Sequence, residues 1–376
     1  MPRPDAACPI CDGLVVRFSS NLHGWTLVSS DARPFRSEVQ VVQCEQCGHI
    51  YKPATKAWQD TTDEIYRTYE IYHQSGGAEQ KVRSESAGGL VSRSNVLVNR
   101  LVEYCGLPER GNILDFGCGN GAFLRAIHDV RPEWHLAGSD LNPGFKQSIE
   151  SISGNATFVQ GGLDEIYGQY DVISLVHCIE HLNDPKHFIR EFARRLKPTG
   201  VIFLQCPNVL ANPFDLLIHD HVSHFTPDHL IEMVEKAGLG PLALLSAMDE
   251  KENSLVAGPG VIGRSHERTS DVALLERQTG VLDQVFGFYN ALSAHAGKVG
   301  IFGTSIAGTW LVNSAERKPD FFVDEDQSRI GRKYYDRPII APGDVPQGAK
   351  VFVPLAPGVA REVSRRLGPA SFLYAV

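Results

Sequence analysis

Three histidines gather around one acid in the second half of the chain. His219, Asp220, His221 and His224 lie within six residues, in the segment 214–227 that we call the histidine loop. Histidine is well suited to move a proton near neutral pH, and a neighbouring carboxylate fixes its tautomer and raises its basicity. The loop therefore predicts acid–base catalysis. Two alternatives stay open: histidines that cap helices, and a second metal site built from H-x-H-x-x-H.

A second group of residues is typical of a turn that cradles a nucleotide. Asp115 precedes three alternating glycines, Gly117, Gly119 and Gly121, and Asp140 ends the next apolar run. Glycines let the backbone approach a ligand, and the helix that follows presents unpaired N–H groups. An acid at the end of the second strand of a βαβ unit bonds ribose hydroxyls. The pattern predicts a cofactor site with Asp140 on the ribose, and the alternative is a turn that only packs strand against helix.

Four cysteines form two C-x-x-C pairs within the first fifty residues, Cys8 with Cys11 and Cys44 with Cys47. Each pair can present two thiolates to one tetrahedral metal ion, and four thiolates leave no open position for a substrate. The spacing therefore predicts a structural zinc site. A redox C-x-x-C requires a thioredoxin-like βαβ context, which residues 13–42 do not supply.

The elements that must position these residues form an α/β architecture in several domains, because 376 residues exceed one ordinary core. Apolar runs alternate with helical periodicity from residue 113 to residue 205, as in a Rossmann-like sheet. The order strand, glycine turn, helix, strand, acid recurs over residues 299–324 without the glycine spacing of a dinucleotide site. We expect a zinc-binding domain at 1–60, a helical connector or lid at 61–105, a cofactor-binding core at 106–245, and an amphipathic helix with a second Rossmann-like domain at 246–376.

The run Asp115-x-Gly117-Cys118-Gly119-x-Gly121 resembles the first motif of the class I S-adenosylmethionine-dependent methyltransferases. In that family the first acid and the glycine loop hold the methionine and ribose parts of the cofactor. The resemblance implies adenine contacts after the third strand, at Gly162. We also expect Leu141 and His177 to contact the cofactor and Tyr72 of the connector to cover it as a lid, with simple packing of the connector tyrosines as the alternative. Glu180 and His181 are either catalytic or a polar pair that starts a helix.

The order of domains resembles the zinc-containing sugar C-methyltransferases of deoxysugar pathways over nearly the whole chain. Those enzymes methylate C3 of a 4-keto-deoxysugar carried on a nucleotide diphosphate. The family's loop reads Tyr-His-Glu-His-Leu-Ser-Tyr-Phe-Ser, which here is the segment 218–226. The resemblance implies that His221 is the base and that Asp220 is its partner acid. The oxygen of the enolate then needs a hydrogen-bond donor, for which His219, His224 and a tyrosine are the candidates. The family's active-site tyrosine is replaced by Ile218.

Charge and composition restrict the partners. The formal net charge is −8 and the pI is about 6.0, and residues 1–60 hold six basic and six acidic side chains, which gives no basic face for phosphate. We expect a small-molecule substrate, a nucleotide sugar, with no nucleic acid and no membrane, in a cytoplasmic protein that lacks a signal peptide. Methylation of oxygen or nitrogen, an RNA methyltransferase and a non-catalytic cofactor-binding scaffold remain as alternatives. The sequence leaves the oligomeric state open.

Overall fold

The computed structural model describes residues 7–14, 16–18, 22, 24–35, 39–69, 79, 81–84, 89–244, 250–260 and 270–375. The chain forms two compact units. Unit 1 contains residues 1–76, 208–224 and 270–376, and unit 2 contains residues 77–207 and 225–269. Within the described ranges, no helix is both long and apolar enough to cross a membrane.

Unit 2 is built on a seven-stranded sheet with the strand order β10-β9-β8-β11-β12-β15-β14. Neighbouring strands are parallel from β10 to β12, whereas β15 runs antiparallel to both of its neighbours. The strands are β8 (Asn112–Phe116), β9 (His135–Asp140), β10 (Ala156–Gln160), β11 (Tyr170–Val176), β12 (Leu196–Pro207), β14 (Leu239–Leu244) and β15 (Glu252–Pro259). The remaining elements are a hairpin and five helices: β6 (Lys81–Ser84), β7 (Gly89–Ser92), α2 (Arg93–Cys105), α3 (Ala122–Val130), α4 (Lys146–Glu150), α5 (Pro185–Ala193) and α6 (Pro227–Lys236).

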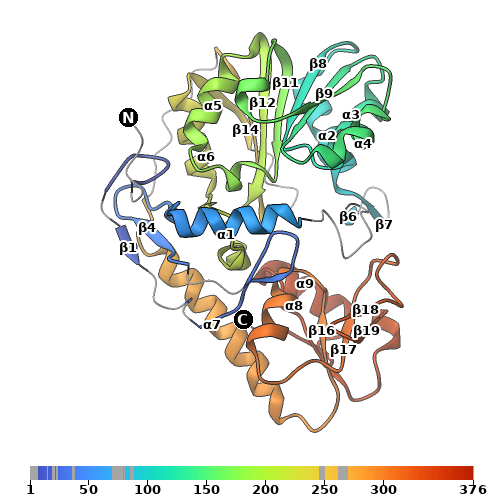
Figure 1. The fold of residues 1–376 in the computed structure, drawn as a ribbon. Coiled ribbons are helices and arrows are strands. Elements are labelled where there is room, and N and C mark those ends of the chain that lie inside the picture. Colours follow the sequence, from blue (N-terminus) through green and yellow to red (C-terminus); the bar gives the residue numbers. More distant parts are fainter. Residues whose placement is uncertain are drawn as a thin grey trace. The chain divides into compact units, whose positions relative to one another are not determined.

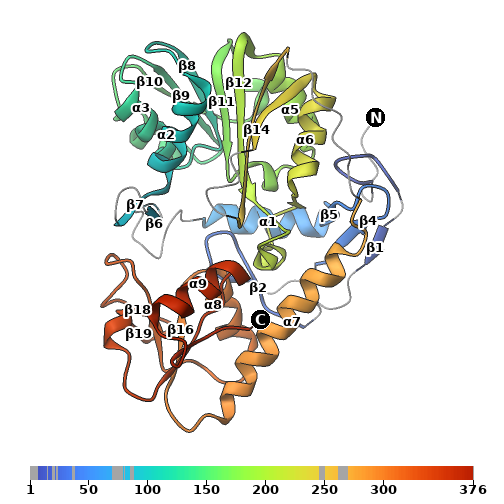
Figure 2. The same cartoon turned by 180° about the vertical axis from the view of Figure 1, so that it is seen from behind.

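Helices α3 and α5 cover opposite faces of this sheet. Phe123 of α3 stacks on Phe203 of β12, with ring centroids 5.8 Å apart, whereas Phe192 of α5 contacts Phe116 of β8 at 5.0 Å. The strand register directs Phe203 and the residue before Phe116 to one face, so Phe116 points to the other. Both views show α5 and α6 on one side of the sheet and α2 and α3 on the other (Figures 1 and 2).

The strand order reverses between β8 and β11. The chain continues from β8 through α3 to β9, toward one edge of the sheet, and from β11 through α5 to β12, toward the opposite edge. In open α/β sheets, ligands bind outside the carboxyl ends of the strands at such a point. The segments that follow β8 and β11 are the glycine turn and residues 177–181. The fold of unit 2 therefore directs attention to these two segments.

In unit 1 the histidine loop adds a strand to an N-terminal sheet. The order is β1-β4-β5-β13, and all pairs are antiparallel. Strands β1 (Val16–Phe18), β4 (Val42–Cys44) and β5 (Ile50–Tyr51) come from the N-terminal segment, whereas β13 (Ser223–His224) comes from the histidine loop. A hairpin of β2 (Leu27–Val28) and β3 (Pro34–Phe35) gives a second attachment, since the Val28 carbonyl accepts a hydrogen bond from the His219 N–H at 2.8 Å. Main-chain bonds to two N-terminal hairpins thus fix the loop.

The C-terminal part of unit 1 contains a six-stranded sheet with the order β18-β19-β17-β16-β20-β21, parallel except for β18. The expected succession of strand, glycine turn, helix and parallel strand is present. The strands are β16 (Val299–Phe302), β17 (Phe321–Val323), β18 (Lys333–Tyr334), β19 (Arg337–Ile340), β20 (Lys350–Phe352) and β21 (Phe372–Leu373). The helices of unit 1 are α1 (Lys56–Arg67), α7 (Leu274–Ala291), α8 (Ile306–Ser314) and α9 (Pro357–Leu367).

One apolar core joins distant segments of unit 1. Leu216 and Leu217 of the histidine loop are fully buried, together with Val28 of β2, Leu282 of α7 and Trp310 of α8. Burying two leucine side chains stabilises the loop by roughly 3–6 kcal/mol on transfer scales. Because of this anchoring, residues 208–224 belong to unit 1. From the sequence we expected them in the cofactor-binding core at 106–245.

Candidate functional site

The glycine turn and the segment after β11 lie side by side in unit 2. Gly117 has a positive φ of 74°, and a Cβ on it would lie 2.7 Å from Cys178 Sγ. Gly119 and Gly121 also have positive φ values, of 50° and 83°. Side chains are disfavoured in this conformation, so the three glycines are required by the turn itself. The turn leads into α3, whose first N–H groups have no partner within the helix and receive no side-chain cap from Gly121, as in a turn that cradles a ligand.

Asp140 ties the glycine turn to the end of β9. Its Oδ2 accepts a hydrogen bond from the Gly119 N–H at 3.0 Å, and its Oδ1 accepts one from the Asn142 N–H at 2.9 Å. Burial raises the pKa of this carboxyl, and the backbone hydrogen bonds from Asn142 and Gly119 oppose that shift. Each carboxylate oxygen has a second lone pair, so these contacts leave Asp140 able to accept from a ribose hydroxyl.

Asp115 supplies a second buried acid at the same sheet edge. Ser174 Oγ donates to its Oδ1 at 2.7 Å, and burial raises the pKa of Asp115 to about 7, with the charge of Asp140 adding to the shift. Two desolvated carboxyls close to one another favour a ligand that carries positive charge. S-Adenosylmethionine carries a sulfonium and an ammonium group, and the residues present therefore fit this cofactor.

The other predicted cofactor contacts occupy different settings. Leu141 follows β9 and is exposed, and a Cβ on Gly162, after β10, would meet no atom within 4 Å. His177 follows β11 with a positive φ of 51°, and its Nε2 lies 2.9 Å from Arg93 Nη1. An arginine can only donate, so Nε2 accepts and the proton is on Nδ1, which lies 3.3 Å from Glu180 Oε1. Tyr72 lies outside the described residues.

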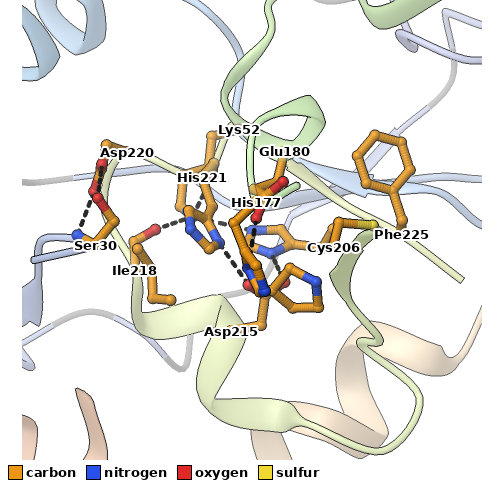
Figure 3. Close-up of polar contacts among 12 residues, drawn as sticks. Ser30, Lys52, His177, Glu180, Cys206, Asp215, Ile218, Asp220, His221 and Phe225 are labelled. Carbon is orange, nitrogen blue, oxygen red and sulfur yellow. Dashed lines mark hydrogen bonds and ion pairs between the residues drawn. The ribbon is translucent and has the colours of Figure 1, made fainter. Parts of the chain in front are cut away.

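In unit 1 a buried carboxylate joins two of the three loop histidines. His221 Nδ1 lies 2.6 Å from Asp215 Oδ1, and His224 Nδ1 lies 2.5 Å from Asp215 Oδ2. Figure 3 shows Asp215 beneath the His221 ring. Burial acts to raise the pKa of Asp215, but the neighbouring imidazoles of His224 and His221 hold it well below its usual value. Asp215 is therefore ionised, and each imidazole donates its Nδ1–H to it.

The acid that contacts the His221 ring at Nδ1 is thus Asp215, and the expected pairing with Asp220 is corrected. Asp220 accepts hydrogen bonds from the Ser30 N–H at 2.8 Å and from Ser30 Oγ at 2.5 Å, and so binds the loop to the turn between β2 and β3 (Figure 3). The reason is local geometry. Asp215 lies in the 3₁₀ turn η5 (Pro213–Leu217), and the chain folds back after it, which brings residue 221 to its carboxylate. Sequence adjacency pointed to the wrong acid.

His219 lies in a different environment from the other two histidines. Its ring packs against Phe35, with centroids 4.8 Å apart, and its Nε2 lies 2.9 Å from Thr61 Oγ1 of α1. The indole N–H of Trp58 donates to its carbonyl at 3.1 Å. Burial lowers the pKa of His219 to about 4, and the positive charge of Lys52 adds to the shift, so its imidazole is neutral at pH 7. His219 therefore joins the loop to α1.

The four N-terminal cysteines form one cluster in unit 1. Their sulfur atoms lie within 4.8 Å of one another, with Cys8 and Cys47 3.6 Å apart and Cys11 and Cys44 3.5 Å apart. Sulfurs that share a tetrahedral zinc ion at about 2.3 Å are separated by about 3.8 Å. The backbone N–H of Gly13 lies 3.4 Å from Cys11 Sγ and adds to the stabilisation of a thiolate. The arrangement fits a tetrahedral metal ion.

Comparison with known proteins agrees with this reading of unit 2. Residues 93–244 match the family described as methyltransferase domain. The matched range contains the glycine turn, Asp140 and the segment after β11. Residues 93–244 therefore form a class I S-adenosylmethionine-dependent methyltransferase domain.

Individual relatives cover parts of the chain. It is 26% identical to C-methyltransferase NovU of Streptomyces niveus over 53% of this chain and 50% of that protein. It is 27% identical to the ubiquinone biosynthesis O-methyltransferase of Aeromonas salmonicida over 34% of this chain and 62% of that protein. The solved structure of mitomycin 7-O-methyltransferase MmcR has a TM-score of 0.42 and 15% identity over 55% of this chain and 62% of that one. The chain thus spans half to three-fifths of the length of these curated relatives.

The position of Asp140 predicts a role in cofactor affinity. We expect Asp140→Ala to weaken binding of S-adenosylmethionine by at least about tenfold, since a lost charged hydrogen bond costs ~1.5–3 kcal/mol. Isothermal titration calorimetry measures this, with circular dichroism to confirm the fold. Glu133→Ala, which removes an exposed acid of the same unit, is the matched control and should bind as the wild type does. Unchanged affinity in Asp140→Ala would remove this acid from the site.

Proposed function

We propose that the chain transfers a methyl group from S-adenosylmethionine to a nucleotide-linked deoxysugar, at a carbon next to a ketone, with His221 as the general base. The observation that carries this proposal is the pairing of His221 Nδ1 with the ionised, buried Asp215. A proton on Nδ1 leaves the lone pair on Nε2, which is the form of imidazole that accepts a proton. The methyltransferase domain and the likeness to C-methyltransferase NovU support the same reaction class.

The reaction is balanced with these groups. His221 Nε2 takes the proton from the carbon next to the ketone, and the electron pair of the C–H bond forms an enolate. The cofactor supplies an electrophilic methyl group on a sulfonium. When bound, the cofactor would transfer this methyl group to the enolate carbon and would leave as a neutral thioether that keeps the electron pair of the broken S–CH₃ bond. Asp215 stabilises the imidazolium that forms on His221, because their hydrogen bond becomes a full ion pair.

Methylation of a hydroxyl group is the second candidate. The match to the ubiquinone biosynthesis O-methyltransferase favours it, although that match covers 34% of the chain. A hydroxyl also needs a base, and His221 would remove its proton in the same way. The histidine loop therefore supports both reactions, and the atom that receives the methyl group distinguishes them.

We further propose that the cysteine cluster holds one structural zinc ion. Four thiolates complete a tetrahedral site, so the ion orders the chain and leaves no position for a substrate. The first two cysteines precede β1, Cys44 ends β4, and Cys47 lies in the turn between β4 and β5. A metal ion there would fix the sheet to which the histidine loop adds β13.

Product analysis tests the proposed substrate class. Incubation with ¹³C-methyl-labelled S-adenosylmethionine and a panel of nucleotide 4-keto-deoxysugars should give a singly methylated nucleotide sugar by mass spectrometry. Carbon NMR then identifies the atom bonded to the label. A methyl group on oxygen would establish the second candidate. Turnover confined to phenols or quinones in a parallel panel would contradict the sugar substrate.

The role of His221 predicts the effect of its removal. His221→Asn should lower kcat by roughly 10²–10⁴, the usual share of general-base catalysis, without changing cofactor affinity or zinc content. Wild-type enzyme should also exchange the proton next to the substrate ketone with deuterated water in the absence of a methyl donor, and His221→Asn should not. His187→Asn, on the exposed side of α5, is the control for the substitution. Full turnover by His221→Asn would refute the assignment.

The cysteine cluster predicts about one zinc ion per chain. Elemental analysis of protein purified without added zinc should find it, and Cys44→Ser should lower both the zinc content and the thermal stability. Cys105→Ser, a substitution at a cysteine of α2 in unit 2, should retain the metal. Protein without zinc whose four thiols are oxidised in pairs would be incompatible with a metal site.

A further inference from the structure

A buried lysine lies beside the histidine loop and has no part in the reaction described above. Lys52 directly follows β5, and 1% of its surface is exposed. Its Nζ lies 2.7 Å from the Ile218 carbonyl, 2.8 Å from the His221 carbonyl and 3.0 Å from His224 Nε2 (Figure 3). Lysine is almost never fully buried unless its charge is paired. The site therefore has a specific need for this side chain.

The three contacts determine where the protons are. An ammonium group has three N–H donors and no acceptor, and here each donor meets one acceptor. His224 Nε2 must then carry a lone pair, so the proton of this imidazole is on Nδ1 and is donated to Asp215 Oδ2. The other oxygen of Asp215 accepts from His221 Nδ1. One continuous array runs from Lys52 through His224 and Asp215 to His221.

The opposite arrangement of protons is disfavoured. A neutral Lys52 has only two N–H donors, which the two carbonyls would take, and His224 would then have to donate from Nε2. Its Nδ1 lone pair would face the ionised Asp215, two acceptors at 2.5 Å, which is repulsive. Burial lowers the pKa of Lys52 to about 7, and the charges of Asp215 and Asp220 oppose that shift. The array thus couples the charge on Lys52 to the tautomer of His224.

His224 is a weak base in this array. Burial lowers the pKa of His224 to about 4, with the charge of Lys52 as the next cause. It therefore remains neutral and serves as a bridge between a positive and a negative group. Asp215 keeps its negative charge and directs it at His221.

We propose that Lys52 is a positioning residue for proton abstraction: through His224 and Asp215 it fixes the tautomer of His221 that leaves Nε2 as the base. The effect of Lys52 on catalysis rests on the proposed function. The tautomers of His221 and His224 follow from the hydrogen bonds alone and do not depend on it. Lys52 also binds two loop carbonyls, so a purely structural role is the competing explanation. The experiment must separate the two.

Nitrogen NMR of ¹⁵N-histidine-labelled protein reads the tautomers directly. His221→Gln and His224→Gln assign the signals. In the wild-type protein at about pH 6, below the pKa of Lys52, His224 should be neutral with its proton on Nδ1, and His221 should also carry a proton on Nδ1. Lys52→Met should release His224 from a single tautomer or allow it to bind a proton at a higher pH, because the charge that opposes protonation has been removed. A His224 with its proton on Nε2 in the wild type would overturn the proposal even if Lys52→Met does not fold.

Kinetics complete the test. Lys52→Met should lower kcat by about ten- to a hundredfold, with KM for the acceptor and affinity for S-adenosylmethionine within about twofold of wild type. Lys56→Met, which removes an exposed lysine of α1, is the matched control and should show no change. A loss of activity with unchanged histidine tautomers would show that Lys52 only supports the loop. If nucleotide sugars are not substrates, the proposed function fails and the NMR result still decides the role of Lys52.

Discussion

The arrangement of the N-terminal segment and the histidine loop in unit 1 depends on the buried negative charge of Asp215. A carboxylate removed from water is tolerated only where hydrogen bonds and opposite charge replace the lost solvation. Here two imidazole N–H groups donate to it, and the charge of Lys52 lies close enough to interact with it. The acid comes from residue 215 and the cation from residue 52. The N-terminal segment and the histidine loop must therefore come together, although residues 77–207 of unit 2 lie between them in sequence.

Charge compensation of Asp215 by Lys52 also requires the N-terminal sheet to be held in a fixed register. Lys52 reaches its three acceptors only if β5 is fixed in register against β13, where Ser223 pairs with Tyr51. The turn between β4 and β5 contains Cys47 and follows Cys44, so the cysteine cluster lies at the turn that leads into β5, the strand directly before Lys52. The cysteine-rich segment therefore contributes strands to the sheet that β13 of the histidine loop joins, and so helps to position the loop histidines.

Local patterns predicted the parts of this protein that depend on local structure. The alternation of apolar runs and helices gave the strands of unit 2, the glycine spacing gave a turn with three positive φ values, and the C-x-x-C pairs gave a four-sulfur cluster. Asp215 and Lys52 were missed because nothing near them in sequence marks them. In the sequence, Asp215 resembles an ordinary acidic residue of a turn, next to leucines. Lys52 resembles a solvent-exposed lysine that follows a short strand. Their importance appears only when main-chain pairing brings residues 50–52 against residues 218–224.

At position 218 the backbone makes structural contacts that do not depend on which side chain is present. In the family that the chain resembles, an active-site tyrosine occupies this place, and here it is Ile218. The backbone of Ile218 carries the structural contacts: its carbonyl accepts from Lys52, and it bridges Val28 in parallel. Neither contact depends on the side chain. The loop can therefore keep its proton array while the side chain at 218 changes. An aliphatic group there removes one hydroxyl donor, so any acceptor oxygen that a tyrosine would bind must be matched by another group or be absent from the substrate.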